Sequence, residues 1–265
     1  MSDASAKPGL DRFIVFERIP NFRDFGGHAT VSGGRVKRGQ LFRSAGLHNA
    51  SDADLIKLET LGLDLVIDLR RRHERVLEPS RRPANFSATV IENDDPDLAS
   101  APHIAIASGG PPDPVSVHGR LMDYYRATPF DARHQALFGA GLKAAADAKG
   151  PLLIHCAAGK DRTGIMSGLI LHALGVHSDD ITGEYLLTEH ADLRRSLLDS
   201  AIRMAKETGR VMPPESLDVM LSAQADFIES AGHAMREKSG SVDSYLDSLG
   251  CDERMRARLR DRLVA

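Results

Sequence analysis

Short apolar runs alternate with amphipathic segments along this chain of 265 residues. Residues 63–69, 88–91 and 152–155 are compact apolar runs that predict buried strands. Apolar positions recur at helical spacing over residues 117–126 and 133–148. This alternation predicts an α/β fold with a mainly parallel central sheet flanked by helices.

Capping residues mark two further helices. Ser51, followed by aspartates in the first turn, predicts the start of a helix that ends near Gly62. From Thr163 onward, apolar residues occupy more than one face of a helical pattern that ends at Gly175. We therefore expect this second helix to be central and buried.

The C-terminal half is rich in helical patterns. Ser178 begins a helix, and polar helical segments continue to about Thr208. Pro213 and Pro214 break the pattern. Beyond them, three further helices are predicted over residues 217–231, 242–249 and 252–263.

The remaining segments are expected to be irregular. Residues 1–12 predict a flexible tail, and residues 13–43, with two Gly pairs, predict an irregular hairpin. Residues 93–114 are rich in Asp, Pro, Ser and Gly and predict a long surface loop, a length typical of functional or mobile segments. No linker separates two folded units, so residues 1–265 are expected to form a single domain.

Composition excludes several classes of protein. A net charge of −3 gives no electrostatic basis for nucleic-acid binding. Two distant cysteines do not form a disulfide framework and suit a reducing compartment. The polar N-terminus is unlike a Sec signal peptide, and no apolar run reaches the roughly 18 residues of a membrane span. We expect a soluble, cytoplasmic protein; secretion without a signal and the oligomeric state stay open.

The candidate chemistry lies in residues 151–164. An apolar strand runs into Cys156, a tight loop follows, and Arg162 stands six residues beyond the cysteine. Backbone N–H groups of such a loop and the N-terminus of the next helix bind anions and favour a thiolate. The planar fork of Arg162 suits two oxygens of a tetrahedral oxyanion. This pattern predicts a phosphatase that forms a cysteinyl-phosphate.

These residues resemble a known family. Residues 155–164 read His-Cys-Ala-Ala-Gly-Lys-Asp-Arg-Thr-Gly, which resembles the H-C-x5-R-[ST]-G loop of protein tyrosine phosphatases. The Lys-Asp pair resembles the PtpB-like bacterial branch, as do Asn-Phe-Arg-Asp-Phe-Gly-Gly at residues 21–27 and Asp-Leu-Arg at residues 68–70, four residues before Glu74. The end of the chain is also similar, so the resemblance covers nearly the whole sequence.

The resemblance implies roles for individual residues. Cys156 is the nucleophile, and Thr163 assists departure of its thiolate or simply caps the helix. His155 orders the loop and favours the thiolate, although a plain core histidine is the alternative. The phosphate is bound by Arg162 and by the loop backbone at Ala157, Ala158, Gly159 and Lys160. Supporting positions beneath the site are Arg23, Asp24 and Arg70, with an ordinary Arg23–Asp24 ion pair as the alternative.

The acid that protonates the leaving oxygen is left open between two aspartates. The chain has no tryptophan and so cannot carry the Trp-Pro-Asp loop of classical tyrosine phosphatases. Asp161 resembles the loop aspartate of the bacterial branch, although it also suits a bond to loop N–H groups or a pair with Lys160. Asp68 stands at the carboxyl end of a predicted strand, where sheet enzymes place their chemistry. Solvated turn positions are expected for Asp94, Asp95 and Asp97.

The resemblance also implies the substrates. These are phosphotyrosine proteins, with phosphoserine, phosphothreonine and phosphoinositides as further classes, and no cofactor or metal is expected. Lys160 is expected at the rim of the phosphate pocket, where added positive charge favours phosphoinositides. Part of residues 178–235 is expected to form a helical lid over Cys156; helices packed permanently on the core are the alternative.

Other functions fit the sequence less well. A nucleotide-binding P-loop requires Gly where Ile154 stands and Ser or Thr where Asp161 stands. A sulfur transferase or arsenate reductase is disfavoured by the spacing of Arg162 and by Thr163. A pseudophosphatase that binds phosphorylated partners remains the non-enzymatic alternative, although the loop lacks no essential residue.

Overall fold

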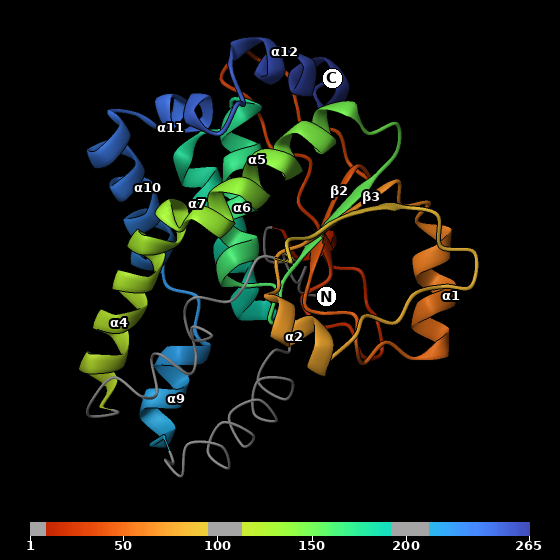
Figure 1. Cartoon of the computed structure of the whole chain (residues 1–265), viewed down its shortest axis with the longest axis horizontal. Helices are drawn as coiled ribbons and strands as arrows, with labels where there is room; N and C mark the ends of the chain where they lie inside the picture. Colours follow the sequence, from red (N-terminus) through yellow and green to blue (C-terminus); the bar gives the residue numbers. More distant parts are fainter. Residues whose placement is uncertain (1–8, 95–112, 192–211) are drawn as a thin grey trace, which may run out of the picture.

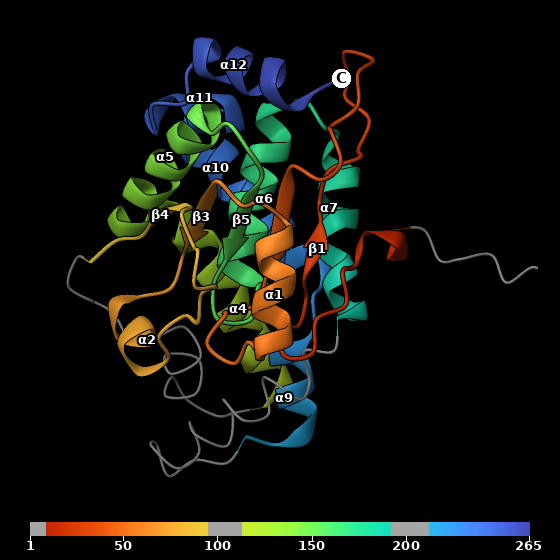
Figure 2. The same ribbon diagram turned by 90° about the vertical axis from the view of Figure 1, so that its right-hand side faces the viewer.

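The structure, a computed structural model, describes residues 9–94, 113–191 and 212–265. Its centre is a five-stranded sheet of order β1-β2-β5-β3-β4 (Figures 1 and 2). Strands β2, β5, β3 and β4 are parallel, and β1 pairs antiparallel with β2 at one edge. The predicted mainly parallel α/β fold is confirmed. The strands are β1 (Arg23–Asp24), β2 (Leu41–Ser44), β3 (Leu65–Asp68), β4 (Thr89–Ile91) and β5 (Leu152–His155).

Helices cover both faces of the sheet. Helix α1 (Asp52–Thr60) lies on one side (Figures 1 and 2). On the other side lie α4 (Pro114–Ala127), α5 (Ala132–Asp147), α6 (Asp161–Ala173) and α10 (Ala225–Ser239). The first half also contains α2 (Arg72–Leu77). The second half also contains α7 (Ser178–Leu186), α9 (Pro214–Leu221), α11 (Val242–Ser248) and α12 (Glu253–Leu263). Within the described ranges, 3₁₀ turns span Leu10–Arg12, Thr128–Phe130 and Leu187–His190.

Alternation along the strands divides the apolar side chains between two cores. Successive strand residues point to opposite faces of a sheet. Val66 and Leu153 therefore join the smaller cluster beneath α1, while Ile67 and Ile154 join the larger cluster with α4, α5 and α6. Because helices cover both faces of the sheet, the central strands consist mostly of consecutive apolar residues.

Several predicted element boundaries hold in the structure. Ser51 accepts a hydrogen bond from the backbone N–H of Asp54 and completes a capping box at the start of α1. Helix α6 ends before Gly175, whose φ of 83° lies in the left-handed region typical of a helix C-terminus. Strand β5 matches the predicted residues 152–155.

The predicted helix over residues 217–231 is wrong as a single element. It is divided into α9 and α10 at residues 222–224. The carbonyls of Met220 and Ser222, which a continuous helix would use internally, accept hydrogen bonds from Nζ of Lys160 at 2.7 and 2.9 Å. A contact with a residue 60 positions away thus outweighs the local helical periodicity.

Other segments differ from expectation only locally. The six-residue helix α2 was not predicted, because it is too short to display a helical repeat. Residues 10–12 form a 3₁₀ turn inside the predicted tail, and Asp113 caps α4, which begins three residues earlier than expected. Most of the predicted loop over 93–114 lies outside the described residues. No helix in the described part of the chain is long and apolar enough to cross a membrane.

Candidate active site

The loop after β5 lies at the carboxyl edge of the sheet, where three strands end side by side. His155, the last residue of β5, is in register with Ser44 of β2 on one side and with Asp68 of β3 on the other. Cys156 follows at once, and α6 begins at Asp161. The loop therefore stands between the ends of β2 and β3. This is the edge at which parallel sheets place functional groups.

Hydrogen bonds from outside the loop turn its carbonyl groups away from its centre. The backbone N–H of Gly46 donates to the carbonyl of Ala157 at 2.9 Å. Nδ2 of Asn21 donates to the carbonyls of Ala158 at 3.3 Å and Gly159 at 2.8 Å. Because a trans peptide unit is planar, with N–H opposite C=O, the N–H groups point to the inner side of the loop. This is the geometry of an anion-binding nest.

Gly159 is required by both its conformation and its surroundings. Its φ of 67° lies in the left-handed region. A Cβ atom at this position would lie 2.3 Å from the carbonyl oxygen of Ser44, so no other residue fits. Arg43 also reaches the Gly159 carbonyl, with an Nη2–O distance of 2.8 Å.

A buried ion triad holds the two side chains that orient the loop. Nε of Arg23 lies 2.7 Å from Oε1 of Glu184, and Nη1 of Arg43 lies 2.6 Å from Oε2. Burial by itself would raise the pKa of Glu184, but the two arginines outweigh it and lower the pKa to about 2. Arg23 also donates to the side-chain oxygen of Asn21. The triad thus connects α7 to the loop through Asn21 and Arg43.

Arg23 and Asp24 bind different partners, although they are neighbours in sequence. Arg23 pairs with Glu184 and not with Asp24. Asp24 instead accepts hydrogen bonds from the backbone N–H groups of Gly26 and Gly39, each at 2.7 Å. Arg23 therefore joins Glu184 to Asn21, while Asp24 holds the N-terminal turns together.

Arg162 is held by the carboxylate of Glu74, which in the sequence stands out only as the last residue of the motif at residues 68–74. Its Nη1 and Nη2 donate to the two carboxylate oxygens of Glu74 at 2.6 and 2.9 Å, and Nη1 also reaches the carbonyl of Leu69 at 3.2 Å. Burial opposes the charge, but Glu74 outweighs it and holds the pKa of Arg162 well above its ordinary value. The guanidinium stays charged and has one orientation beside Cys156, whose thiol is free and only 2% exposed. The spacing of Glu74 after Arg70 was the available signal.

His155, Asp68 and Arg70 form a buried cluster. Arg70 binds both oxygens of Asp68, with Nε–Oδ1 3.0 Å and Nη2–Oδ2 2.7 Å. Burial would raise the pKa of Asp68, but His155 and Arg70 outweigh it and lower that pKa. Burial also lowers the pKa of His155 to about 4, against the opposing charge of Asp68. His155 is therefore neutral near pH 7 and adds no positive charge beside Cys156; its Nδ1 lies 3.4 Å from the Cys156 carbonyl.

Asp161 differs from Asp68 in exposure and in partners. Its side chain is 25% exposed, whereas that of Asp68 is 1% exposed. Oδ1 of Asp161 accepts a hydrogen bond from the hydroxyl of Tyr125 at 2.7 Å. Among the other aspartates considered, Asp94 pairs with Arg75, and Asp95 and Asp97 lie outside the described residues.

Two loop residues lie elsewhere than expected. Thr163 is inside the first turn of α6 and does not cap it, since the capping position is Lys160. Its hydroxyl is fully buried and has no hydrogen-bond partner in the described part of the chain. Lys160 is not solvent-facing at a pocket rim: it is 2% exposed, and Nζ binds the carbonyls between α9 and α10.

The contact of Lys160 also bears on the predicted lid. It brings the junction between α9 and α10 against the cysteine loop. Residues 192–211, in the middle of the segment considered, lie outside the described residues. A movable cover over Cys156 stays a prediction.

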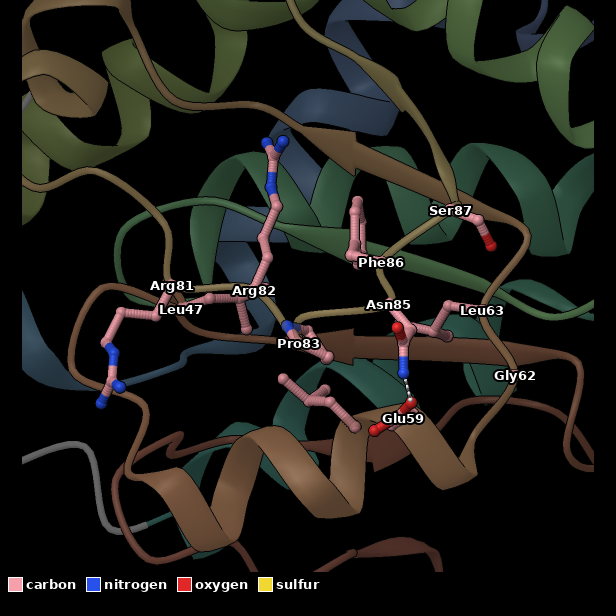
Figure 3. A pocket seen from close by; sticks show the side chains of 11 residues that line it. Leu47, Glu59, Gly62, Leu63, Arg81, Arg82, Pro83, Asn85, Phe86 and Ser87 are labelled. Atoms are coloured by element: carbon pink, nitrogen blue, oxygen red, sulfur yellow. Dashed lines mark hydrogen bonds between the residues drawn. The ribbon is translucent and has the colours of Figure 1, made fainter.

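A separate cavity of about 80 Å³ lies between α1 and residues 81–87, where Figure 3 shows Phe86 and Pro83 beside Arg82. None of the residues 155–164 lines it. Within the three described ranges, no group of three or more His, Cys, Asp and Glu side chains is arranged to hold a metal ion.

Sequence comparisons relate this chain to known proteins. Residues 14–265 match the sequence profile of the tyrosine phosphatase family. A Cupriavidus necator protein assigned by name to the tyrosine-protein phosphatases is 33% identical over 95% of this chain and 88% of its own length. The triple specificity protein phosphatase PtpB of Mycobacterium tuberculosis is 29% identical over 92% of this chain and 96% of its own. A tyrosine-protein phosphatase of Nostoc commune is 27% identical over 83% and 73%.

The chain therefore belongs to the tyrosine phosphatase family, in its PtpB-like bacterial branch. This confirms the resemblance drawn from the loop and from the motifs at residues 21–27 and 68–74.

Proposed function

We propose that this protein hydrolyses phosphotyrosine and related phosphomonoesters through a cysteinyl-phosphate on Cys156, without a metal or other cofactor. The observation that carries the proposal is the arrangement around Cys156. The N–H groups of the loop face inward, and the charged Arg162 donates hydrogen bonds from both Nη atoms to Glu74. Such donors stabilise the three oxygens of a transferring phosphoryl group. Glu74 acts as a positioning residue for Arg162.

The reaction proceeds in two displacements. In the first, Sγ of Cys156 attacks phosphorus, the bond to the leaving oxygen breaks, and that oxygen takes a proton from Asp161. In the second, the Asp161 carboxylate takes a proton from water, whose oxygen attacks phosphorus and displaces the thiolate. In this mechanism the departing sulfur is stabilised by Thr163, whose buried hydroxyl has no hydrogen-bond partner within the described ranges and is available for that role.

Asp161 suits the role of general acid better than Asp68 does. An acid must reach the leaving oxygen, and the Asp161 side chain is partly exposed at the start of α6. Asp68 is buried and binds Arg70 through both oxygens, which favours its ionised form. Asp68 therefore positions Arg70 and His155 behind the loop.

The substrate range extends beyond phosphotyrosine to phosphoserine, phosphothreonine and phosphoinositides. The relative from Mycobacterium tuberculosis is named a triple specificity phosphatase, which supports a broad range. Lys160 supplies a positive charge one residue after Gly159. On binding a phosphoinositide, its Nζ exchanges the carbonyls of Met220 and Ser222 for the additional anionic groups of the ring.

Turnover of para-nitrophenyl phosphate in the presence of a chelator tests the central proposal. We expect full activity with the chelator, inhibition by vanadate, and protection of Cys156 from alkylation by phosphate. A strict requirement for added metal would contradict the mechanism. Binding of phosphopeptides without any turnover would identify a pseudophosphatase instead.

The variant Lys160→Met tests the phosphoinositide activity, because it keeps the aliphatic stem and removes the charge. A hydrogen bond to a charged group contributes about 1.5–3 kcal/mol. We therefore expect phosphoinositide turnover to fall roughly ten- to hundredfold and para-nitrophenyl phosphate turnover to fall distinctly less. Lys143→Met, at an exposed position of α5, is the matched control. Equal losses on both substrates would show that Lys160 only anchors the α9–α10 junction.

A further inference from the structure

Two tyrosine hydroxyls and one carboxylate form a continuous chain of hydrogen bonds at the start of α6. Tyr125 of α4 donates to Oδ1 of Asp161 at 2.7 Å, and the hydroxyl oxygens of Tyr125 and Tyr185 lie 2.6 Å apart. A tyrosine hydroxyl has one proton to donate. Because the single hydroxyl proton of Tyr125 is used in its hydrogen bond to Asp161, Tyr185 of α7 is the donor in the bond between the two hydroxyls.

Packing keeps both rings in place. The ring of Tyr125 stacks on that of Phe227, with centroids 5.6 Å apart and an interplanar angle of 23°. The ring of Tyr185 lies against Gly164, where a Cβ atom would approach Cδ2 of Tyr185 to 2.7 Å. Both tyrosines are at most 1% exposed. The hydroxyl of Tyr125 therefore has a fixed direction relative to Asp161.

The two hydroxyls act as donors and not as acids. Burial and the charge of Asp161 raise the pKa values of Tyr125 and Tyr185 well above their ordinary value. Both groups keep their protons over the pH range of a phosphatase assay. A proton transferred to a leaving group therefore comes from Asp161 and not from the tyrosines.

The same contacts decide which oxygen of Asp161 carries a proton. Oδ1 accepts the bond from Tyr125 and lies 3.4 Å from Nζ of Lys160. A proton on Oδ1 would face both a hydroxyl proton and a positive charge. Oδ2 has no hydrogen bond to the residues that the structure describes, so a proton on Asp161 resides on Oδ2.

We propose that Tyr125, supported by Tyr185, positions Asp161 so that Oδ2 presents its proton to the leaving oxygen. The proposal rests on the role of Asp161 as general acid. The two tyrosines do not touch the reacting atoms, and they act only through the direction of the carboxyl group. A dependence on the leaving group follows, since a general acid matters most when the departing oxygen is strongly basic.

Tyr125→Phe removes one hydroxyl and keeps the ring, and it is compared with wild type on aryl phosphates of graded leaving-group pKa. We expect kcat/KM, which reports on the first displacement alone, to fall roughly tenfold for phenyl phosphate and to change less than about twofold for 2,4-dinitrophenyl phosphate. Tyr185→Phe should give the same pattern with a smaller amplitude, and it provides the test if Tyr125→Phe does not fold. An equal loss on all substrates, or no loss on any, would overturn the proposal.

Two further variants separate this proposal from the proposed function. Asp161→Asn should lose more activity than Tyr125→Phe, with a steeper dependence on the leaving group. If Asp161→Asn has no such dependence, Asp161 is not the acid and the proposal falls with it. If Asp161→Asn has the dependence and Tyr125→Phe lacks it, only the role of the tyrosines is refuted. Tyr245→Phe, a buried hydroxyl that binds the Pro129 carbonyl, should show no dependence.

Discussion

Cys156→Ser is expected to lower the turnover number by roughly 10⁴-fold or more while substrate binding persists, the scale on which loss of a nucleophile acts. Serine keeps the size of the side chain but is not ionised at neutral pH. The loop N–H groups and Arg162 that bind the phosphate are unchanged by the substitution. Single-turnover kinetics and calorimetric titration with a phosphotyrosine peptide measure the two quantities separately.

The second cysteine provides the control. Cys251 is fully buried, and burial raises the pKa of its thiol to about 11. Cys251→Ser should retain turnover per folded molecule, and iodoacetate should modify Cys156 and spare Cys251 in the native protein. Substantial turnover by Cys156→Ser would refute the covalent mechanism.

Glu184→Gln is expected to lower the free energy of unfolding by about 3–5 kcal/mol, the usual cost of removing one partner from a buried ion pair. The substitution leaves Arg23 and Arg43 charged, buried and without their carboxylate. Because Arg43 also holds the carbonyl of Gly159, turnover should fall together with stability. Urea denaturation followed by circular dichroism measures the first effect.

The same carboxylate predicts how stability depends on pH. The pKa of Glu184 is about 2 in the folded protein, against an ordinary value of 4.5. A lowered acidic pKa adds stability that is complete above pH 4.5 and is lost as the pH falls from about 4.5 to about 2. The difference in stability between wild type and Glu184→Gln should therefore shrink over this window.

An exposed glutamate provides the comparison. Glu237 of α10 is exposed, and Glu237→Gln should change stability by less than about 0.5 kcal/mol. If Glu184→Gln were as stable as Glu237→Gln at pH 7, the triad would contribute nothing to the fold, and its role in holding the loop would need another explanation.

Residues of the short family motifs act by contacting the cysteine loop. Asn21, from the N-terminal motif, turns two loop carbonyls outward. Glu74, from α2 after β3, accepts two hydrogen bonds from Arg162. The motifs at residues 21–27, 68–74 and 155–164 thus belong to one site, in which the first two hold the third in its anion-binding shape.

By itself, the sequence determined the elements whose signals are local. Strand β5 and the cysteine loop could be recognised because an apolar run, a nucleophile and an arginine stand at fixed short spacing. The caps of α1 and α6 were recognisable for the same reason, since Ser51 and Gly175 act on the turn of backbone beside them. Signals of this kind depend only on residues that are close in sequence.

Only the tertiary structure decided how distant charges and hydroxyls pair. Arg23 has Asp24 beside it in sequence but binds Glu184, 161 positions away. Lys160 divides a helix that periodicity predicted as continuous, and Tyr125 reaches Asp161 across 36 positions. A buried charge or hydroxyl must find a partner wherever the packed core brings one within about 3 Å, and that choice depends on the whole fold. The periodicity of the sequence does not indicate which distant residues pair.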